Sequence, residues 1–121
     1  MSKNNCKLQT SFEDGVLVAS LEGELDHHGA VAVRTLIDAE ILQKKPQRTV
    51  LELASLDFMD SSGIGLIMGR YSLMQRIGGE FAVRNPNERV LKIFKLAGLE
   101  RMVRIDGKTT ERRRKNEAIG K

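Results

Sequence analysis

The segment of this sequence best suited to chemistry is residues 60–65, which read Asp-Ser-Ser-Gly-Ile-Gly. It follows an apolar run and precedes a helical pattern, so we expect Ser61 and Ser62 at a helix N-terminus, where backbone N–H groups favour an anion. Gly63 and Gly65 each cost a helix about 1 kcal/mol relative to alanine, which indicates a close approach to the backbone. The simpler interpretation is that one serine caps the helix and the glycines only permit tight packing.

Catalysis by a nucleophilic serine or by a metal has little support in the residue pattern. The Gly-x-Ser-x-Gly motif of serine hydrolases is absent around Ser61 and Ser62. His27 and His28 are adjacent and lack the partners and spacing of a zinc site, and there is no Walker A motif. We therefore expect no enzymatic activity, no metal and no cofactor. Asp26 precedes the two histidines and is expected to cap the helix that follows or to belong to a functional loop.

The positive charge of the chain is concentrated near its end. The 121 residues carry a formal net charge of +4, but residues 1–105 hold 14 Lys and Arg against 13 Asp and Glu, whereas residues 106–121 hold 6 against 3. The chain has four Phe, one Tyr and no Trp, too few for a platform that stacks bases. We therefore do not expect nucleic acid to be the direct partner, although the basic tail leaves that alternative open.

Length and composition bound the class of protein. The chain has the size of one globular domain, and no apolar stretch approaches the roughly 20 residues that cross a bilayer. Its one cysteine, Cys6, excludes an intramolecular disulfide. With no visible signal peptide, we expect a cytoplasmic protein that does not bind a membrane.

Hydrophobic spacing predicts alternating strands and helices. Strands are expected at 6–12, 16–21, 49–53, 81–83 and 102–105, and helices along the apolar stripes at 30–41, 64–77 and 90–97. Residues 24–28 and 58–59 are expected in loops. Asn85 is expected to cap the third helix, with Pro86 at its first position and Glu88 closing a capping box. The order predicts an α/β fold with a mixed sheet and parallel crossovers, and residues 108–118 either form a charged terminal helix or fray.

Several segments together resemble the STAS-domain anti-anti-sigma factors, also called anti-sigma factor antagonists, and most closely those of sporulation. They are Leu-Glu-Gly-Glu-Leu-Asp-His-His at 21–28, Phe-Met-Asp-Ser-Ser-Gly-Ile-Gly at 58–65, Gly-Arg-Tyr at 69–71 and Lys-Leu-Ala-Gly-Leu at 95–99. The resemblance implies a STAS fold, with a four- to five-stranded mixed sheet and helices packed mainly on one face. It also implies a single STAS domain over residues 1–105, followed by a C-terminal segment, 106–121, that is more basic than is usual in the family.

The same resemblance implies a partner-switching mechanism. The unphosphorylated protein, a monomer when free, would bind a dimeric anti-sigma factor that is also a serine kinase carrying ATP or ADP, and would thereby release the sporulation sigma factor. Phosphorylation of Ser61 would end binding, and a PP2C-type serine phosphatase would restore it. The resemblance assigns partner binding to Asp26, Asp60, Ser61, Ser62, Gly63 and Ile64. Two alternatives remain: the same role in a stress-response or other regulatory pathway, and a small STAS module that binds a nucleotide or another ligand.

Overall fold

Five strands form one mixed sheet in the computed structural model, which describes residues 5–107. They are β1 (Cys6–Glu13), β2 (Val16–Leu25), β3 (Arg48–Met59), β4 (Glu80–Arg84) and β5 (Arg104–Asp106), and they lie in that order across the sheet. β1 is antiparallel to β2, and the other neighbours are parallel. The expected α/β fold with a mixed sheet is therefore confirmed. The terminal helix or frayed end expected at 108–118 lies outside the described residues.

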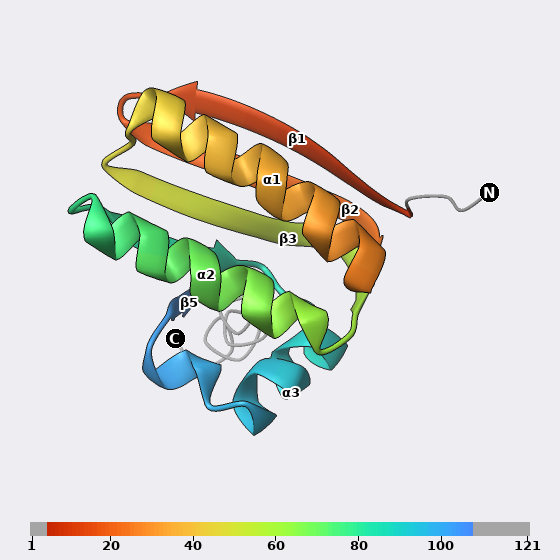
Figure 1. The fold of residues 1–121 in the computed structure, drawn as a ribbon. Coiled ribbons are helices and arrows are strands. Elements are labelled where there is room, and N and C mark those ends of the chain that lie inside the picture. Colours follow the sequence, from red (N-terminus) through yellow and green to blue (C-terminus); the bar gives the residue numbers. More distant parts are fainter. Residues whose placement is uncertain (1–4, 108–121) are drawn as a thin grey trace, which may run out of the picture.

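The helices connect the parallel strands and pack mainly on one face of the sheet. They are α1 (His27–Lys44), α2 (Ser62–Arg76) and α3 (Glu88–Leu96), and a short 3-10 helix, Leu99–Arg101, follows α3. Figure 1 shows α1 and α2 side by side on one face of the sheet, with α1 against β2 and α2 against β3 and β4. Each helix begins just after the carboxyl end of a strand, so the N-termini of α1 and α2 lie at the same edge of the sheet.

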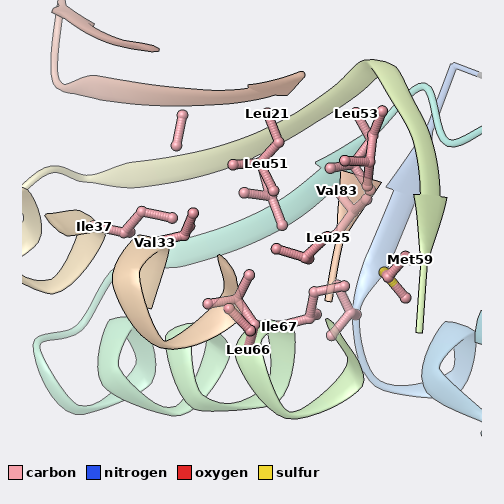
Figure 2. Packing of buried hydrophobic residues seen from close by; sticks show 14 of the residues in the cluster. Leu21, Leu25, Val33, Ile37, Leu51, Leu53, Met59, Leu66, Ile67 and Val83 are labelled. Carbon is pink, nitrogen blue, oxygen red and sulfur yellow. The ribbon is translucent and has the colours of Figure 1, made fainter. Parts of the chain in front are cut away.

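The core lies between this face of the sheet and the two long helices. Alternate residues of β2 and β3 point into it, and the predicted stripe of α1 from Ala30 to Ile41 is buried. Figure 2 shows Leu21 and Leu51 of the sheet, together with Val33 and Ile37 of α1, in this layer. Since burying a Leu, Ile or Val side chain stabilises a fold by about 1.5–3 kcal/mol, this layer holds the helices against the sheet.

Two strands extend further than expected and absorb segments predicted to be loops. β2 continues to Leu25 and β3 to Met59, where these two residues pair, and both are 1% exposed. Register shifts after Ser20 and after Gly23 let the strands stay together through a stretch whose polar residues resemble a loop. His27 and His28 are consequently the first residues of α1 and do not lie in a loop.

The predicted cap of α3 is also wrong by two residues. Asn87 is the N-cap, and its side-chain oxygen accepts a hydrogen bond of 2.8 Å from the N–H of Val90. Asn85 has φ of 60°, in the left-handed region, and its N–H donates to the carbonyl of Asp106 in β5. An N-cap residue needs extended backbone, so the contact of Asn85 with β5 leaves capping to Asn87.

The last predicted strand and the stripe of α2 differ in detail. β5 begins at Arg104, because the preceding residues form the 3-10 helix and its C-cap. In α2, Ile77, which ends the predicted apolar stripe, is 37% exposed, and Met68 within that range is 39% exposed. The buried face of that helix includes Met74 and Arg70.

Candidate partner-docking site

The site is built where β2 and β3 end side by side. Leu25 and Met59 pair at the ends of these strands, and the N–H of Asp60 donates to the carbonyl of Leu25 at 3.1 Å. Asp26 follows one strand and Asp60 follows the other. The structure therefore brings together the two acidic residues that the sequence places 34 positions apart.

Asp26 caps α1, as one of the two interpretations of its position predicted. Its carboxylate accepts a hydrogen bond of 2.9 Å from the N–H of Gly29. This bond lowers the pKa of Asp26, and the nearby His28 lowers it further. Because the Asp26 side chain is also exposed, it can cap the helix and still meet a partner.

The carboxylate of Asp60 organises the start of α2. Its Oδ1 accepts a hydrogen bond of 2.9 Å from the N–H of Ser62 and another from the hydroxyl of Ser62. Neither serine side chain caps the helix, which corrects the simpler interpretation of this segment. The N–H of Gly63 donates to the carbonyl of Asp60, so the first backbone donors already have acceptors. This helix start is therefore not an open binding site for an anion.

Ser61 occupies the turn between β3 and α2 with its side chain exposed. Its φ of −64° and ψ of −16° are helical, and its side chain makes no capping hydrogen bond. Within residues 5–107 no hydrogen bond involves the hydroxyl of Ser61, whereas the hydroxyl of Ser62 is held by Asp60. Of the two adjacent serines, Ser61 is thus the one whose oxygen is ready to meet an incoming group.

Gly63 and Gly65 serve different purposes. A Cβ atom on Gly63 would lie 2.3 Å from Sδ of Met59, so this glycine lets α2 pack closely on the end of β3. A Cβ on Gly65 would meet nothing within 4 Å. Only Gly65 therefore leaves space for an outside group, and Gly63 itself is buried. Ile64, between them, is partly buried and packs against the core.

A groove of about 330 Å³ separates the N-terminal halves of α1 and α2 beside this turn. It is lined by His27, Ala30, Val31, Arg34, Ser62, Gly65 and Leu66. Val31 is an exposed apolar residue, and Arg34 supplies a positive charge. Neither residue was predicted from the sequence to belong to a site. The available signal was their spacing, since residues three, four and seven positions after His27 share a helix face with it.

A partly buried ion pair joins the two helices that form the groove. Nε of Arg70 in α2 lies 2.8 Å from Oδ1 of Asp38 in α1, and the Arg70 side chain is only 8% exposed. Arg70 also donates to the carbonyl of Leu66 at 3.1 Å. Burial lowers the pKa of Arg70, while the charge of Asp38 opposes that shift. The pair fixes α1 and α2 relative to each other just beyond the groove.

The part of the chain that the structure describes has neither a cluster of metal ligands nor a helix suited to a membrane. Residues 5–107 contain no group of three or more His, Cys, Asp or Glu side chains that could hold a metal ion. Nor does any helix in this range have the length and apolar character needed to cross a membrane.

Comparison with known proteins assigns the chain to a family. Residues 7–112 match the STAS domain, and the chain belongs to this family. The anti-sigma F factor antagonist of Paenibacillus polymyxa is 41% identical over 101 residues, which cover 84% of this chain and 86% of that protein. The antagonist of the same name from Lysinibacillus sphaericus is 39% identical over 83 residues, covering 69% and 71%. Within the STAS family, the chain therefore groups with the anti-sigma factor antagonists.

Solved structures agree with this assignment. The unphosphorylated form of the anti-sigma factor antagonist SpoIIAA matches with a TM-score of 0.74 and 30% identity, covering 95% of this chain and 98% of that one. The phosphorylated form of the Bacillus cell fate determinant SpoIIAA matches with a TM-score of 0.67 and 29% identity, covering 89% and 98%. The resemblance to STAS-domain antagonists noted in the sequence is confirmed.

Proposed function

We propose that the unphosphorylated chain binds an anti-sigma factor that is also a serine kinase, and thereby releases a sporulation sigma factor. Two relatives named as antagonists of anti-sigma F are 41% and 39% identical to this chain. The anti-sigma-B factor antagonist of Bacillus subtilis is only 24% identical. This difference favours the sporulation pathway over the stress-response alternative.

The observation that carries the proposal is the uncommitted hydroxyl of Ser61 at an exposed turn. The kinase would transfer the γ-phosphoryl group of ATP to this oxygen, and a PP2C-type phosphatase would remove it. The phosphate would add about −1.5 to −2 charges at pH 7 beside the carboxylate of Asp60. SpoIIAA, a relative solved in both states, keeps a fold similar to this chain in each. The switch would therefore act at the interface, with the fold preserved.

The docking surface would combine the turn with the groove beside it. Its members at the turn are Asp26, Asp60, Ser61, Ser62, Gly63 and Ile64. An anti-sigma factor shaped to receive the neutral hydroxyl of Ser61 would have to bury a phosphate without a partner, which costs several kcal/mol. Since about 1.4 kcal/mol is a tenfold change in affinity, such a cost is enough to release the complex.

Phosphorylation of matched variants tests the assignment to Ser61. Wild-type chain incubated with the cognate kinase and ATP should gain about 80 Da, the mass of one phosphoryl group. Ser61→Ala should gain nothing, whereas the matched control Ser62→Ala should be modified as fully as wild type. Full modification of Ser61→Ala would show that the phosphoacceptor is another residue.

Binding to the anti-sigma factor tests the switch separately. Ser61→Asp should bind the unmodified partner at least tenfold more weakly than wild type, because a buried charge replaces a hydroxyl. Ser61→Ala should bind about as well as wild type and should release the sigma factor in a competition assay. Equal affinities for Ser61→Asp and Ser61→Ala would contradict the electrostatic account.

We further propose that residues 1–105 form the single STAS domain that docks, and that the basic segment 106–121 takes no part. The proposed docking turn follows β3, in the middle of the sheet, whereas β5, the strand that precedes the basic segment in the sequence, lies at the edge. A chain ending at Gly107 should therefore keep its affinity for the anti-sigma factor. Loss of binding on truncation would assign the segment a role.

A further inference from the structure

Within the described residues, β1 is an edge strand that pairs only with β2. This strand has eight residues, Cys6–Glu13, and each pairs with β2 in an unbroken register. In the region from residue 5 to residue 107, no strand pairs with its other edge. Natural proteins guard such edges with proline, bulges or charges, and β1 contains no proline and no register shift. Its protection therefore rests on its two charged residues, Lys7 and Glu13.

The side chains of β1 divide between the two faces of the sheet. Leu8 and Phe12 lie opposite Leu21 and Leu17 of β2, which belong to the core, so they share the face covered by helices. Leu8 is partly buried against the core, but Phe12 is 41% exposed. Lys7 and Glu13 alternate with these residues and lie on the opposite face.

The β1 strands of two copies of this chain are complementary to each other when they run antiparallel. If the two copies are related by a two-fold axis perpendicular to the sheet, the helix-covered faces of both copies lie on the same side. Residues that lie opposite each other must then have side chains on the same face of the sheet. When the axis passes between the Thr10 residues of the two copies, Lys7 of each copy faces Glu13 of the other. In that same register Leu8 faces Phe12 of the second copy. Centring on Gln9 or on Ser11 loses both pairings.

We propose that two copies of this chain associate through antiparallel pairing of their β1 strands, centred on Thr10, to give one continuous sheet. The charges that deter other strands become attractive in this register, and each exposed Phe12 gains an apolar neighbour. β1 lies at the outer edge of the sheet, two strands from β3, so the turn at Ser61 stays accessible. This association replaces the monomer that the family resemblance leads one to expect for the free protein.

Paired charge reversals test this register. Wild type should show a concentration-dependent monomer–dimer equilibrium in sedimentation velocity. Lys7→Glu places like charges opposite each other at both ends of the strand pair, and Glu13→Lys does the same with the opposite sign. Each variant alone should therefore associate about tenfold more weakly than wild type. An equimolar mixture of the two should regain association as a heterodimer, because every charge then faces its opposite.

Two controls separate this test from simple unfolding. Lys7 also faces Glu22 within the hairpin, so Lys7→Glu is checked by its melting curve, whereas Glu13 faces the neutral Val16. Phe12→Thr keeps the strand propensity and every charge, and it should also weaken the dimer, because Leu8 loses its partner. A wild-type chain that stays monomeric at the highest concentrations, or a mixture that fails to regain association, would overturn the proposal.

Discussion

The carboxylate of Asp60 accepts hydrogen bonds from both the backbone N–H and the hydroxyl of Ser62. The Asp60 carboxylate thus gives the hydroxyls of the two adjacent serines different hydrogen-bonding states. It holds the second serine in the helix start and leaves the hydroxyl of Ser61 uncommitted and exposed. If Ser61 is the phosphoacceptor, as proposed, local hydrogen bonding would favour it over Ser62 by leaving its hydroxyl available.

Removing this carboxylate should loosen the start of α2. We expect Asp60→Ala to lower the free energy of unfolding by about 1 kcal/mol, the usual cost of losing a helix cap. Asp60→Asn should lose less, because its amide oxygen can still accept from the N–H of Ser62. Urea unfolding measures both, and Asp57→Ala, which removes a nearby exposed carboxylate, is the control. Equal losses for Asp60→Ala and Asp57→Ala would show that the cap contributes nothing.

The two glycines of the turn should respond in opposite ways to the same change. Gly63→Ala would force a Cβ to 2.3 Å from Sδ of Met59, and we expect a loss of about 1–3 kcal/mol of stability as the core adjusts. Gly65→Ala meets open space in a helix and should be neutral or stabilising by up to about 1 kcal/mol. Thermal and urea unfolding compare them. A stable Gly63→Ala would mean that the Met59 side chain moves aside freely.

The ion pair between α1 and α2 should contribute more than the exposed pairs. We expect Arg70→Met to cost about 2 kcal/mol, because it leaves the partly buried carboxylate of Asp38 without its cation. Arg48→Met, which breaks an exposed pair with Glu80, should cost less than about 1 kcal/mol. A double-mutant cycle with Asp38→Asn isolates the coupling. Additive effects in that cycle would show that the two side chains do not stabilise each other.

Asp26 should make the stability of α1 depend on pH. Its folded pKa lies below the ordinary value of 3.8, so its charge stabilises the fold above that value, and this contribution disappears as pH falls through the folded pKa. Asp26→Asn keeps a neutral cap and removes the charge. Wild type should therefore be more stable than the variant near neutral pH, and the difference should vanish in acid. A difference that does not change with pH would argue against a lowered pKa.

The buried thiol of Cys6 should react slowly in the folded protein. Burial raises its pKa to about 11, so little thiolate exists near neutral pH. Labelling by a disulfide reagent should be slow in buffer and fast in denaturant, as absorbance at the wavelength of the released thiol would show. Fast labelling of the native chain would mean that the start of β1 opens readily.

The sequence patterns predicted those features of the fold that depend on interactions between residues close together in the sequence. The stripe of α1 and the cap at Asp26 both depend on residues a few positions apart. That Asp26 belongs with Asp60 was implied by the family resemblance and not by the order of the elements. Prediction failed where distant segments meet. Asn85 is drawn into a left-handed conformation by its bond to β5, and that bond has no sequence signature.

The site shows the same division. The pattern at 60–65 indicated a functional turn, and the family resemblance assigned phosphorylation to Ser61, but the physical difference between the hydroxyls of Ser61 and Ser62 appears only in the geometry. Arg70 occupies a buried position on α2, where a charged residue is unexpected without its partner on α1. The role of Asp38 was invisible because the two residues lie 32 positions apart. Pairing across helices is a property of the packed chain.

The close contact between Gly63 and Met59 has an evolutionary consequence. Substitution at Gly63 is restrained by the fold itself, whatever the chain binds, whereas the fold leaves space for a side chain at Gly65, so any restraint there would come from a docked partner. In a lineage that lost the anti-sigma factor, Gly65 should drift to larger residues while Gly63 persists together with the residue at position 59. The residue at position 63 would then indicate whether a descendant keeps this packing, and the residue at position 65 would indicate whether it keeps a partner.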